Sequence, residues 1–362
     1  MNGQLTPVVF AVNQEYQIMM YVKDPSLMWV KVGDKTFYDE SNGIMRSNTK
    51  IHRVIVPMNL LDKEKSYRVY LRKVIDRKPY FPEFEEVVET QYMFKPVPAE
   101  GRVRGYHISD SHNRVDGPCT AAKTYGNIDF LVLNGDIADH SHFEENCLFL
   151  HEIASEITKG NIPVIFSRGN HDTRGFWAEN LNEFTPTDRG NTYYTFRIGC
   201  VWGMVLDCGE DKVDGHEEYG GTARFHQFRR RETEFMKQVI ENKETEYLAE
   251  GVKHRMVISH IPFTLIKAHP FDIEQELYNQ WVHMIGEHIK PNMLLAGHMH
   301  CLKIIRPGDE QDAYGQSFST VLGATIKKKD PYFAGTGLEM EQGKITVTYT
   351  DSLQQVLNAD YI

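Results

Sequence analysis

The chain has 362 residues, and its 40 Lys and Arg against 50 Asp and Glu give a net charge of −10. This balance argues against a nucleic-acid backbone as the main partner, because proteins that bind one usually carry a basic face. A hydrophobic content of 41% over this length supports ordinary globular cores and leaves room for two domains.

The sequence carries no signal for membrane insertion or export. No uninterrupted apolar run approaches the length of about 20 residues that a membrane helix needs, so no membrane partner is expected. Residues 1–12 lack a basic segment followed by a long apolar core, so no secretory signal is expected either. The cysteines form no CxxC pair and predict reduced, mostly buried thiols in a cytoplasmic protein; they are Cys119, Cys147, Cys200, Cys208 and Cys301.

Residues 1–97 are rich in short β-type segments separated by turn signals such as Ser41-Asn42-Gly43. Strands of this length and spacing predict a small antiparallel sandwich, which we expect to be an independent module without catalytic ligands. The expected strands cover residues 16–22, 28–32, 51–57, 67–74 and 87–94. A linker over residues 95–101 follows, since its two prolines and its glycine disfavour both sheet and helix.

Residues 102–362 alternate between strand and helix patterns, which predicts an α/β domain. Apolar residues recur at helical spacing over residues 143–159, and further helices are expected over 225–242 and 273–289. Residues 201–207 predict a buried strand. Residues 318–326, 337–341 and 344–350 predict a meander that completes a second sheet.

Five short apolar runs in this domain each lead into Asp, Asn or His. The clearest covers residues 130–134 and runs into Gly135 and Asp136. Ligands in α/β folds lie at the carboxyl ends of strands, so we expect the five ends to converge on one edge of a sheet. The residues at these ends are Asp110, His112, Asp136, Asn170, His260, His298 and His300. Because imidazole and carboxylate suit first-row transition metals, the pattern predicts a metal site.

Each of these residues also has a simpler explanation when it is considered alone. His260 is compatible with a satisfied histidine at a strand end, Asn170 with a turn former, and His112 with an exposed side chain. The joint pattern favours the metal site, because ligand-type residues stand at the same structural position in all five stretches. A pair of metal ions about 3.5–4 Å apart would clamp both oxygens in a displacement at phosphorus.

In these blocks the chain resembles the calcineurin-like metallophosphoesterases. The family's ordered signature is D-x-H, G-D, G-N-H-[DE], a single H and G-H-x-H, and the resemblance covers residues 102 to 350. It implies a four-layer αββα sandwich over residues 102–362. Residues 1–97 resemble, more weakly, the fibronectin-III-like module that precedes the catalytic domain in purple acid phosphatases. The matching blocks here are Asp110/His112, Gly135/Asp136, Gly169-Asn170-His171-Asp172, His260 and Gly297-His298-Met299-His300.

The resemblance also implies a mechanism and a role for each matched residue. Two divalent or mixed-valent ions (Mn, Fe or Zn) would hold a bridging hydroxide that attacks the phosphorus of a small phosphoester. His171 would act as the general acid, and Asp172 would orient its ring. The first ion would be held by Asp110, His112, Asp136 and His300, and the second by Asp136, Asn170, His260 and His298.

Two departures from the family pattern bear on which branch of the family the chain resembles. Asp139 stands where purple acid phosphatases carry a ligand Tyr, and the residues that follow Asp136 lack the Arg-containing motif of protein Ser/Thr phosphatases. Arg168 and Arg174 flank the G-N-H-D block, and both phosphate contact and a structural role remain open for them. His140 and His142 lie just after the strand that leads to Asp136, but they are not expected as ligands.

The substrate class has alternatives. Specificity is expected to reside in loops such as residues 173–189 and 208–224, whose composition fits several phosphoesters. A phosphodiesterase acting on nucleotides or lipid head groups is the alternative enzyme, and a non-catalytic metal-binding scaffold is the alternative of another class. The filled ligand positions count against the scaffold. The residues assign no oligomeric state.

Overall fold

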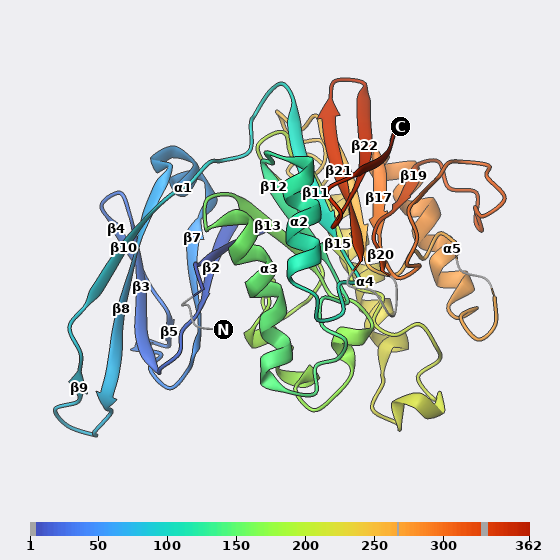
Figure 1. Ribbon diagram of the computed structural model, residues 1–362. Helices are drawn as coiled ribbons and strands as arrows, with labels where there is room; N and C mark the ends of the chain where they lie inside the picture. The colour runs from blue at the N-terminus through green and yellow to red at the C-terminus, as the bar shows by residue number, and fades with distance from the viewer. Residues whose placement is uncertain (1–4, 266–267, 327–331) are drawn as a thin grey trace.

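Two β-sheets lie at the centre of the computed structural model, which describes residues 5–265, 268–326 and 332–362 (Figure 1). The first sheet has the order β23-β22-β21-β11-β12-β13-β1-β2-β7, and β20 pairs with β21. Strands β11, β12, β13 and β1 are parallel to one another. The strands of this sheet are β1 (Val8–Val12), β2 (Glu15–Tyr21), β7 (Ile51–Pro57), β11 (Val103–Ile108), β12 (Phe130–Asn134), β13 (Pro163–Ser167), β20 (Thr325–Ile326), β21 (Phe333–Glu341), β22 (Lys344–Asp351) and β23 (Val356–Tyr361).

The second sheet has the order β14-β15-β16-β17-β19-β18, with β15, β16, β17 and β19 parallel. The strand predicted over residues 201–207 is confirmed as β15. The strands of this sheet are β14 (Tyr194–Ile198), β15 (Val201–Leu206), β16 (His254–Ser259), β17 (Met293–Ala296), β18 (Lys303–Ile305) and β19 (Ser319–Leu322).

Helices cover the outer faces of both sheets. Along β12, Leu131 and Leu133 belong to the apolar cluster that includes α2 (Asp116–Tyr125) and α3 (Phe149–Thr158), whereas Val132 packs in the cluster shared by the two sheets. The opposite face of the second sheet packs against α4 (Phe225–Glu241) and α5 (Gln275–Met284). Since side chains alternate along a strand, one buried strand serves two interfaces. The four-layer αββα prediction is confirmed.

Two of the predicted helices are subdivided. The segment expected over residues 143–159 begins as a 3₁₀ turn, Glu144–Leu148, and becomes α-helical at Phe149. The segment expected over residues 273–289 is α-helical over Gln275–Met284 and ends in a π-helical turn, Ile285–Ile289. None of the helices in the described residues is long and apolar enough to cross a membrane.

The N-terminal region is a β-sandwich whose inner sheet is part of the first central sheet. Its outer sheet packs through Val30 and Val69 in the same apolar cluster as Val54 of β7. Its inner strand β1 pairs with β13, with Val9 opposite Pro163 and Phe10 opposite Val164. The region therefore differs from the expected independent module. The outer sheet has the order β10-β8-β3-β4 and consists of β3 (Ser26–Val32), β4 (Lys35–Tyr38), β8 (Ser66–Asp76) and β10 (Val88–Met93), with β9 (Glu83–Phe84) paired to β8; α1 (Met58–Glu64) follows β7.

The C-terminal strands differ from the expected meander in their partners. β19 belongs to the second sheet, but β21 and β22 extend the first sheet, where Leu338 of β21 lies opposite Gly105 of β11. Alternating apolar residues predict that a segment is a strand, but they do not specify its partner, since pairing is decided by contacts between distant segments.

Candidate metal centre

The predicted ligand residues follow five strand ends and lie together where the two sheets meet. β11, β12 and β13 of the first sheet lead into Asp110, Asp136 and Asn170, whereas β16 and β17 of the second sheet lead into His260 and His298. The site is therefore shared by the edges of two sheets, and the expectation of a single sheet edge is corrected. Parallel strands place their carboxyl ends on the same side in both sheets.

Several of these residues have an unusual backbone conformation. The φ angles are 52° at Asp110, 44° at His112, 51° at Asp136, 66° at His298 and 47° at His300. The left-handed region is uncommon for residues with a Cβ, and such strain is found where function holds it in place. A hydrogen bond joins two of these turns: the backbone N–H of His112 donates to the carbonyl of Asp136 at 3.1 Å.

The motif glycines allow the strand ends to approach each other closely. A Cβ at Gly169 would lie 2.2 Å from Oδ1 of Asp136, and one at Gly297 would lie 2.6 Å from Oδ2 of Asp110. Any side chain at either position would displace a carboxylate. The glycines of these motifs are therefore required by the site rather than by turn formation alone.

One group of ligand-type atoms consists of Asp110, His112 and His300, whose donor atoms lie within 4.8 Å of one another. Nε2 of His300 is 3.2 Å from Oδ1 of Asp110 and 3.2 Å from Nε2 of His112. Asp110 is fully buried, and the His300 side chain is 36% exposed, so solvent reaches the group from the histidine side.

A second group consists of Asp136, His260 and His298. Nε2 of His260 lies 3.1 Å from Oδ2 of Asp136. Asn170 adjoins this group, since its Oδ1 lies 3.1 Å from Nδ1 of His298. All seven predicted ligands are thus placed in one cluster.

The tautomers of two histidines indicate that the cluster fits cations. Nδ1 of His260 lies 2.7 Å from the carbonyl oxygen of Asn134, and Nδ1 of His112 lies 3.1 Å from Oδ1 of Asp139. Both oxygens are acceptors, so both Nδ1 atoms carry hydrogen and each ring directs its Nε2 into the cluster. The buried Nε2 of His260 faces a carboxylate and has no hydrogen-bond partner among the described residues. A positive charge between this nitrogen and the Asp136 carboxylate would stabilise the arrangement, and a bound metal ion would supply it.

The electrostatics of the buried groups lead to the same conclusion. Burial opposes the charged form of His260, but Asp136 and Asp110 raise its pKa to about 10. Burial likewise opposes ionisation of Asp110 and Asp136, yet His260 holds the pKa of both carboxyls below the usual value. Two buried carboxylates that stay ionised need positive charge beside them, which a proton or a metal ion supplies.

His171 lies beside the second group, and both of its ring nitrogens face groups other than Asp172. Nδ1 lies 2.8 Å from the carbonyl oxygen of Asp139, and Nε2 lies 4.0 Å from Oδ2 of Asp136. Oδ2 of Asp172 instead accepts from the backbone N–H groups of Gly169 at 2.8 Å and Asp136 at 3.1 Å. The expectation that Asp172 orients the His171 ring is therefore wrong, because its carboxylate holds the backbone of the site.

Burial and the neighbouring Asp136 carboxylate raise the pKa of Asp172 to about 7. Asp139 contacts both imidazoles instead: its backbone carbonyl faces Nδ1 of His171, and its side-chain carboxylate faces Nδ1 of His112. The sequence singled out Asp139 only as a departure from a family pattern, since a backbone carbonyl contact has no residue signature.

The two arginines that flank the G-N-H-D block are bound by carboxylates of the protein. Nε of Arg168 lies 2.7 Å from Oδ2 of Asp207, and Arg174 donates to both carboxylate oxygens of Glu210 at 2.7 and 2.8 Å. These contacts favour the structural role that the sequence left open. His142 is exposed and packs edge-on against Phe143, with 4.6 Å between ring centroids.

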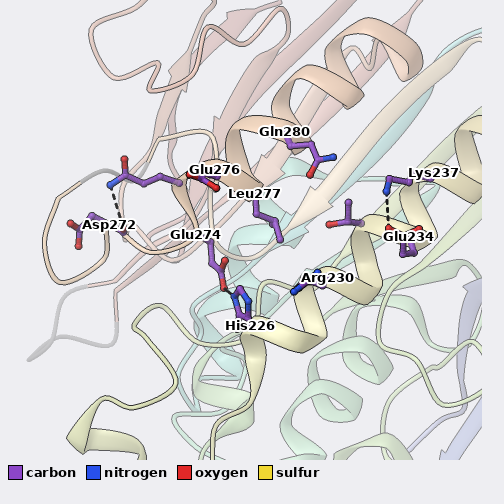
Figure 2. A pocket seen from close by; sticks show the side chains of 11 residues that line it. His226, Arg230, Glu234, Lys237, Asp272, Glu274, Glu276, Leu277 and Gln280 are labelled. Atoms are coloured by element: carbon purple, nitrogen blue, oxygen red, sulfur yellow. Dashed lines mark hydrogen bonds and ion pairs between the residues drawn. The ribbon is translucent and has the colours of Figure 1, made fainter.

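A groove of about 600 Å³ lies between α4 and the start of α5, away from the cluster (Figure 2). His226 and Arg230 of α4 face Glu274 across it, and Nδ1 of His226 lies 2.8 Å from Oε1 of Glu274. Within the described part of the chain, none of the predicted site residues lines this groove. The groove is therefore separate from the cluster of ligand-type residues at the sheet edges.

Comparisons with known proteins give one family and one fold. The model of the calcineurin-like phosphoesterase family matches residues 104–302. A purple acid phosphatase, PPD1, from yellow lupin (Lupinus luteus) seeds has a TM-score of 0.61 and 13% identity, with 99% of this chain and 74% of that chain covered. The structure of PhoD has a TM-score of 0.58 and 10% identity, with 99% and 88% covered. No sequence among the curated proteins matches the chain significantly.

Proposed function

The chain belongs to the calcineurin-like phosphoesterase family and is a metal-dependent hydrolase of phosphoric esters, and on this premise we propose that it is a phosphatase with a dinuclear centre. The observation that carries the proposal is the presence of two adjoining groups of ligand-type atoms at the joined sheet edges. One ion is assigned to Asp110, His112, Asp136 and His300, and the other to Asp136, Asn170, His260 and His298.

Asp136 is assigned to both ions for two reasons. It is the one residue shared by both ligand sets that the family resemblance implies, and the backbone N–H of His171 holds its Oδ1 at 2.9 Å, so that Oδ2 faces the cluster. When bound, the ions would supply charge that neutralises phosphoryl oxygens and acidifies a water molecule. Their identity is taken to be Mn, Fe or Zn, since the family generally uses divalent ions and this ligand set suits them.

His171 is proposed as the general acid because of its hydrogen bond to Asp139. A carbonyl oxygen only accepts, so Nδ1 of His171 carries a hydrogen and Nε2 is the nitrogen that gains and loses the catalytic proton. The side chain is 30% exposed, so Nε2 remains accessible to a leaving oxygen. Proton donation to that oxygen lowers the barrier most when the leaving group is strongly basic.

Asp139 is proposed to position two imidazoles. Its carboxylate lies against Nδ1 of His112 and its carbonyl against Nδ1 of His171, at 3.1 and 2.8 Å. Partners of this kind fix the tautomer and the ring direction of a ligand histidine.

The test is to strip the protein of metal and restore Mn, Fe or Zn separately, with each form assayed on a panel of phosphomonoesters and phosphodiesters. The phosphatase among the similar folds makes monoester hydrolysis the first reaction to test. Preference for nucleotide or lipid-type diesters would select the phosphodiesterase alternative. Metal binding without hydrolysis of any ester would favour a non-catalytic scaffold.

Metal content tests the dinuclear assignment separately. Protein loaded in excess metal is expected to hold two ions per chain, and Asp136→Ala to lose both or bind them weakly. A reproducible value of one ion per chain, or unchanged binding by Asp136→Ala, would refute the bridging role.

A further inference from the structure

Asp211 lies against the outer side of His298, on the 208–224 loop that the sequence associated with specificity. Nδ1 of His298 faces Asn170 at 3.1 Å, so the ring turns its Nε2 outward, and Oδ2 of Asp211 lies 3.7 Å from this nitrogen. Asp211 is 7% exposed. The ring thus lies between two acceptors, the Asn170 amide oxygen at Nδ1 and the buried Asp211 carboxylate at Nε2. With a cation between Nδ1 and the Asn170 oxygen, the carboxylate favours the tautomer that carries its hydrogen on Nε2 and keeps the lone pair on Nδ1.

The other oxygen of Asp211 is held in place by its own loop. Oδ1 lies 2.9 Å from Nζ of Lys212 and accepts from the hydroxyl of Tyr219 at 3.1 Å. Both partners are largely buried, and Lys212 also pairs with Glu218 at 3.0 Å. With Oδ1 occupied, Oδ2 is the oxygen left to face His298.

Two arginines anchor the loop to the body of the domain. Arg229, which is 1% exposed, donates to the carbonyls of Cys208 and Glu210. Its guanidinium is paired at 3.1 Å with Glu274, one of the residues that line the groove in Figure 2. Arg174 holds the Glu210 carboxylate next to Asp211. The position of Asp211 is thus set by two charged side chains, the buried Arg229 and the partly exposed Arg174.

We propose that Asp211 is a positioning residue, whose carboxylate orients His298 so that Nδ1 is presented to the second cation. This inference rests on the proposed dinuclear centre and adds a residue that no signature motif contains. Asp211 itself touches neither ion nor substrate in this assignment. Outer carboxylates of this kind raise the basicity of a ligand histidine and fix its direction.

The experiment titrates metal-free protein with Zn²⁺ alone by calorimetry. Wild type is expected to bind two ions, and Asp211→Ala to bind one of them about 10–100-fold more weakly while the affinity for the other is unchanged. Asp211→Asn retains an acceptor but no charge and is expected to lose less. Glu217→Gln removes a charge from an exposed residue of the same loop and serves as the matched control, with both affinities unchanged.

A second measurement separates positioning from general support of the fold. In ¹⁵N-histidine NMR spectra of the zinc-loaded wild type, His298 is expected to carry its hydrogen on Nε2, and this resonance is expected to change in Asp211→Asn at an unchanged melting temperature. Equal affinities in folded Asp211→Ala and wild type would overturn the inference, as would equal weakening of both ions together with a lower melting temperature. A wild type that binds fewer than two zinc ions would instead refute the dinuclear centre, and the inference with it.

Discussion

His171 is the imidazole of the site whose proposed role depends on the substrate. With Nδ1 bound to the carbonyl of Asp139, its Nε2 is the atom that would deliver the proton to the leaving oxygen in the proposed mechanism. An alkoxide needs this proton and a nitrophenolate hardly does. His171→Ala is therefore expected to slow alkyl phosphate hydrolysis by about 10²–10⁴-fold and nitrophenyl phosphate hydrolysis far less.

Steady-state rates on both esters, with metal content measured in parallel, check this prediction. Metal content is expected to stay at the wild-type value. The exposed His142 offers a control, since His142→Ala removes a nearby imidazole without touching the cluster. Equal losses on both esters, or loss of an ion, would identify His171 as a structural residue or a ligand.

Asp139 leads to a spectroscopic prediction. The coloured relatives carry a ligand tyrosine at this position, and a carboxylate gives no tyrosinate-to-iron charge transfer. Protein loaded with ferric ion is expected to lack the strong visible band of the purple enzymes, as an absorption spectrum will test. A strong band that disappears when a tyrosine elsewhere is replaced would contradict this.

Residue types and spacing predicted the ligand cluster because each motif is local. Asp110 and His112 leave one turn together, as do His298 and His300, and Gly297 at the second of these turns signals close approach. Asp139 and Asp211 support histidines that are distant in the sequence, through contacts that only the fold creates. No spacing rule marks such residues, so sequence analysis missed their roles.

At the scale of the element, α3 contains a buried histidine that links stability to pH. Nε2 of His151 lies 2.7 Å from the carbonyl oxygen of Phe184, and its buried Nδ1 has no hydrogen-bond partner in the described residues. Burial lowers the pKa of His151 from its ordinary value of 6.5 to about 4. The neutral ring is the stable form, and protonation would bury an unpartnered charge.

The sign of the effect follows from the lowered pKa. The contribution of His151 is fully present above pH 6.5, where both folded and unfolded chains are neutral, and is lost as the pH falls from 6.5 towards 4. His151 contributes at most about 1.4 kcal/mol per pH unit to the change of the unfolding free energy with pH. Denaturant unfolding of His151→Gln is expected to show a shallower fall of the unfolding free energy over this range. His283→Gln, at an exposed position of α5, is the control, and an unchanged slope in His151→Gln would refute the prediction.

Helix and strand types were largely predictable, because apolar periodicity reports which faces are buried. The partners of the strands were not. β21 pairs with β11 across more than two hundred residues, and β1 pairs with β13 across an intervening sandwich. Such pairings depend on which sheet edge is still unpaired when the other strands and helices have packed. No local sequence pattern specifies this edge.

At the scale of the whole molecule, the N-terminal sandwich and the catalytic sheets share one hydrogen-bonded structure. β1 covers the edge of β13, whose residues lead directly to Asn170 and His171. Val9 and Ala11 of β1 are completely buried in the apolar cluster that contains Ile165 of β13. Residues 1–97 thus complete the core beneath the site, although none of their side chains belongs to it in the described part of the chain.

We therefore expect a chain that lacks residues 1–98 to lose cooperative folding. Removal of these residues would leave β13 without its partner β1, as an unprotected edge with buried apolar side chains on both faces, and such edges promote aggregation. Near-ultraviolet circular dichroism and thermal melting, with zinc content measured on soluble protein, check this expectation. The matched control replaces residues 77–82 at the exposed tip between β8 and β9, where Phe81 is 91% exposed, with an Asn-Gly turn, and is expected to melt like wild type with its zinc retained. A truncated chain that melts cooperatively and holds two zinc ions would show that the sandwich is an independent module after all.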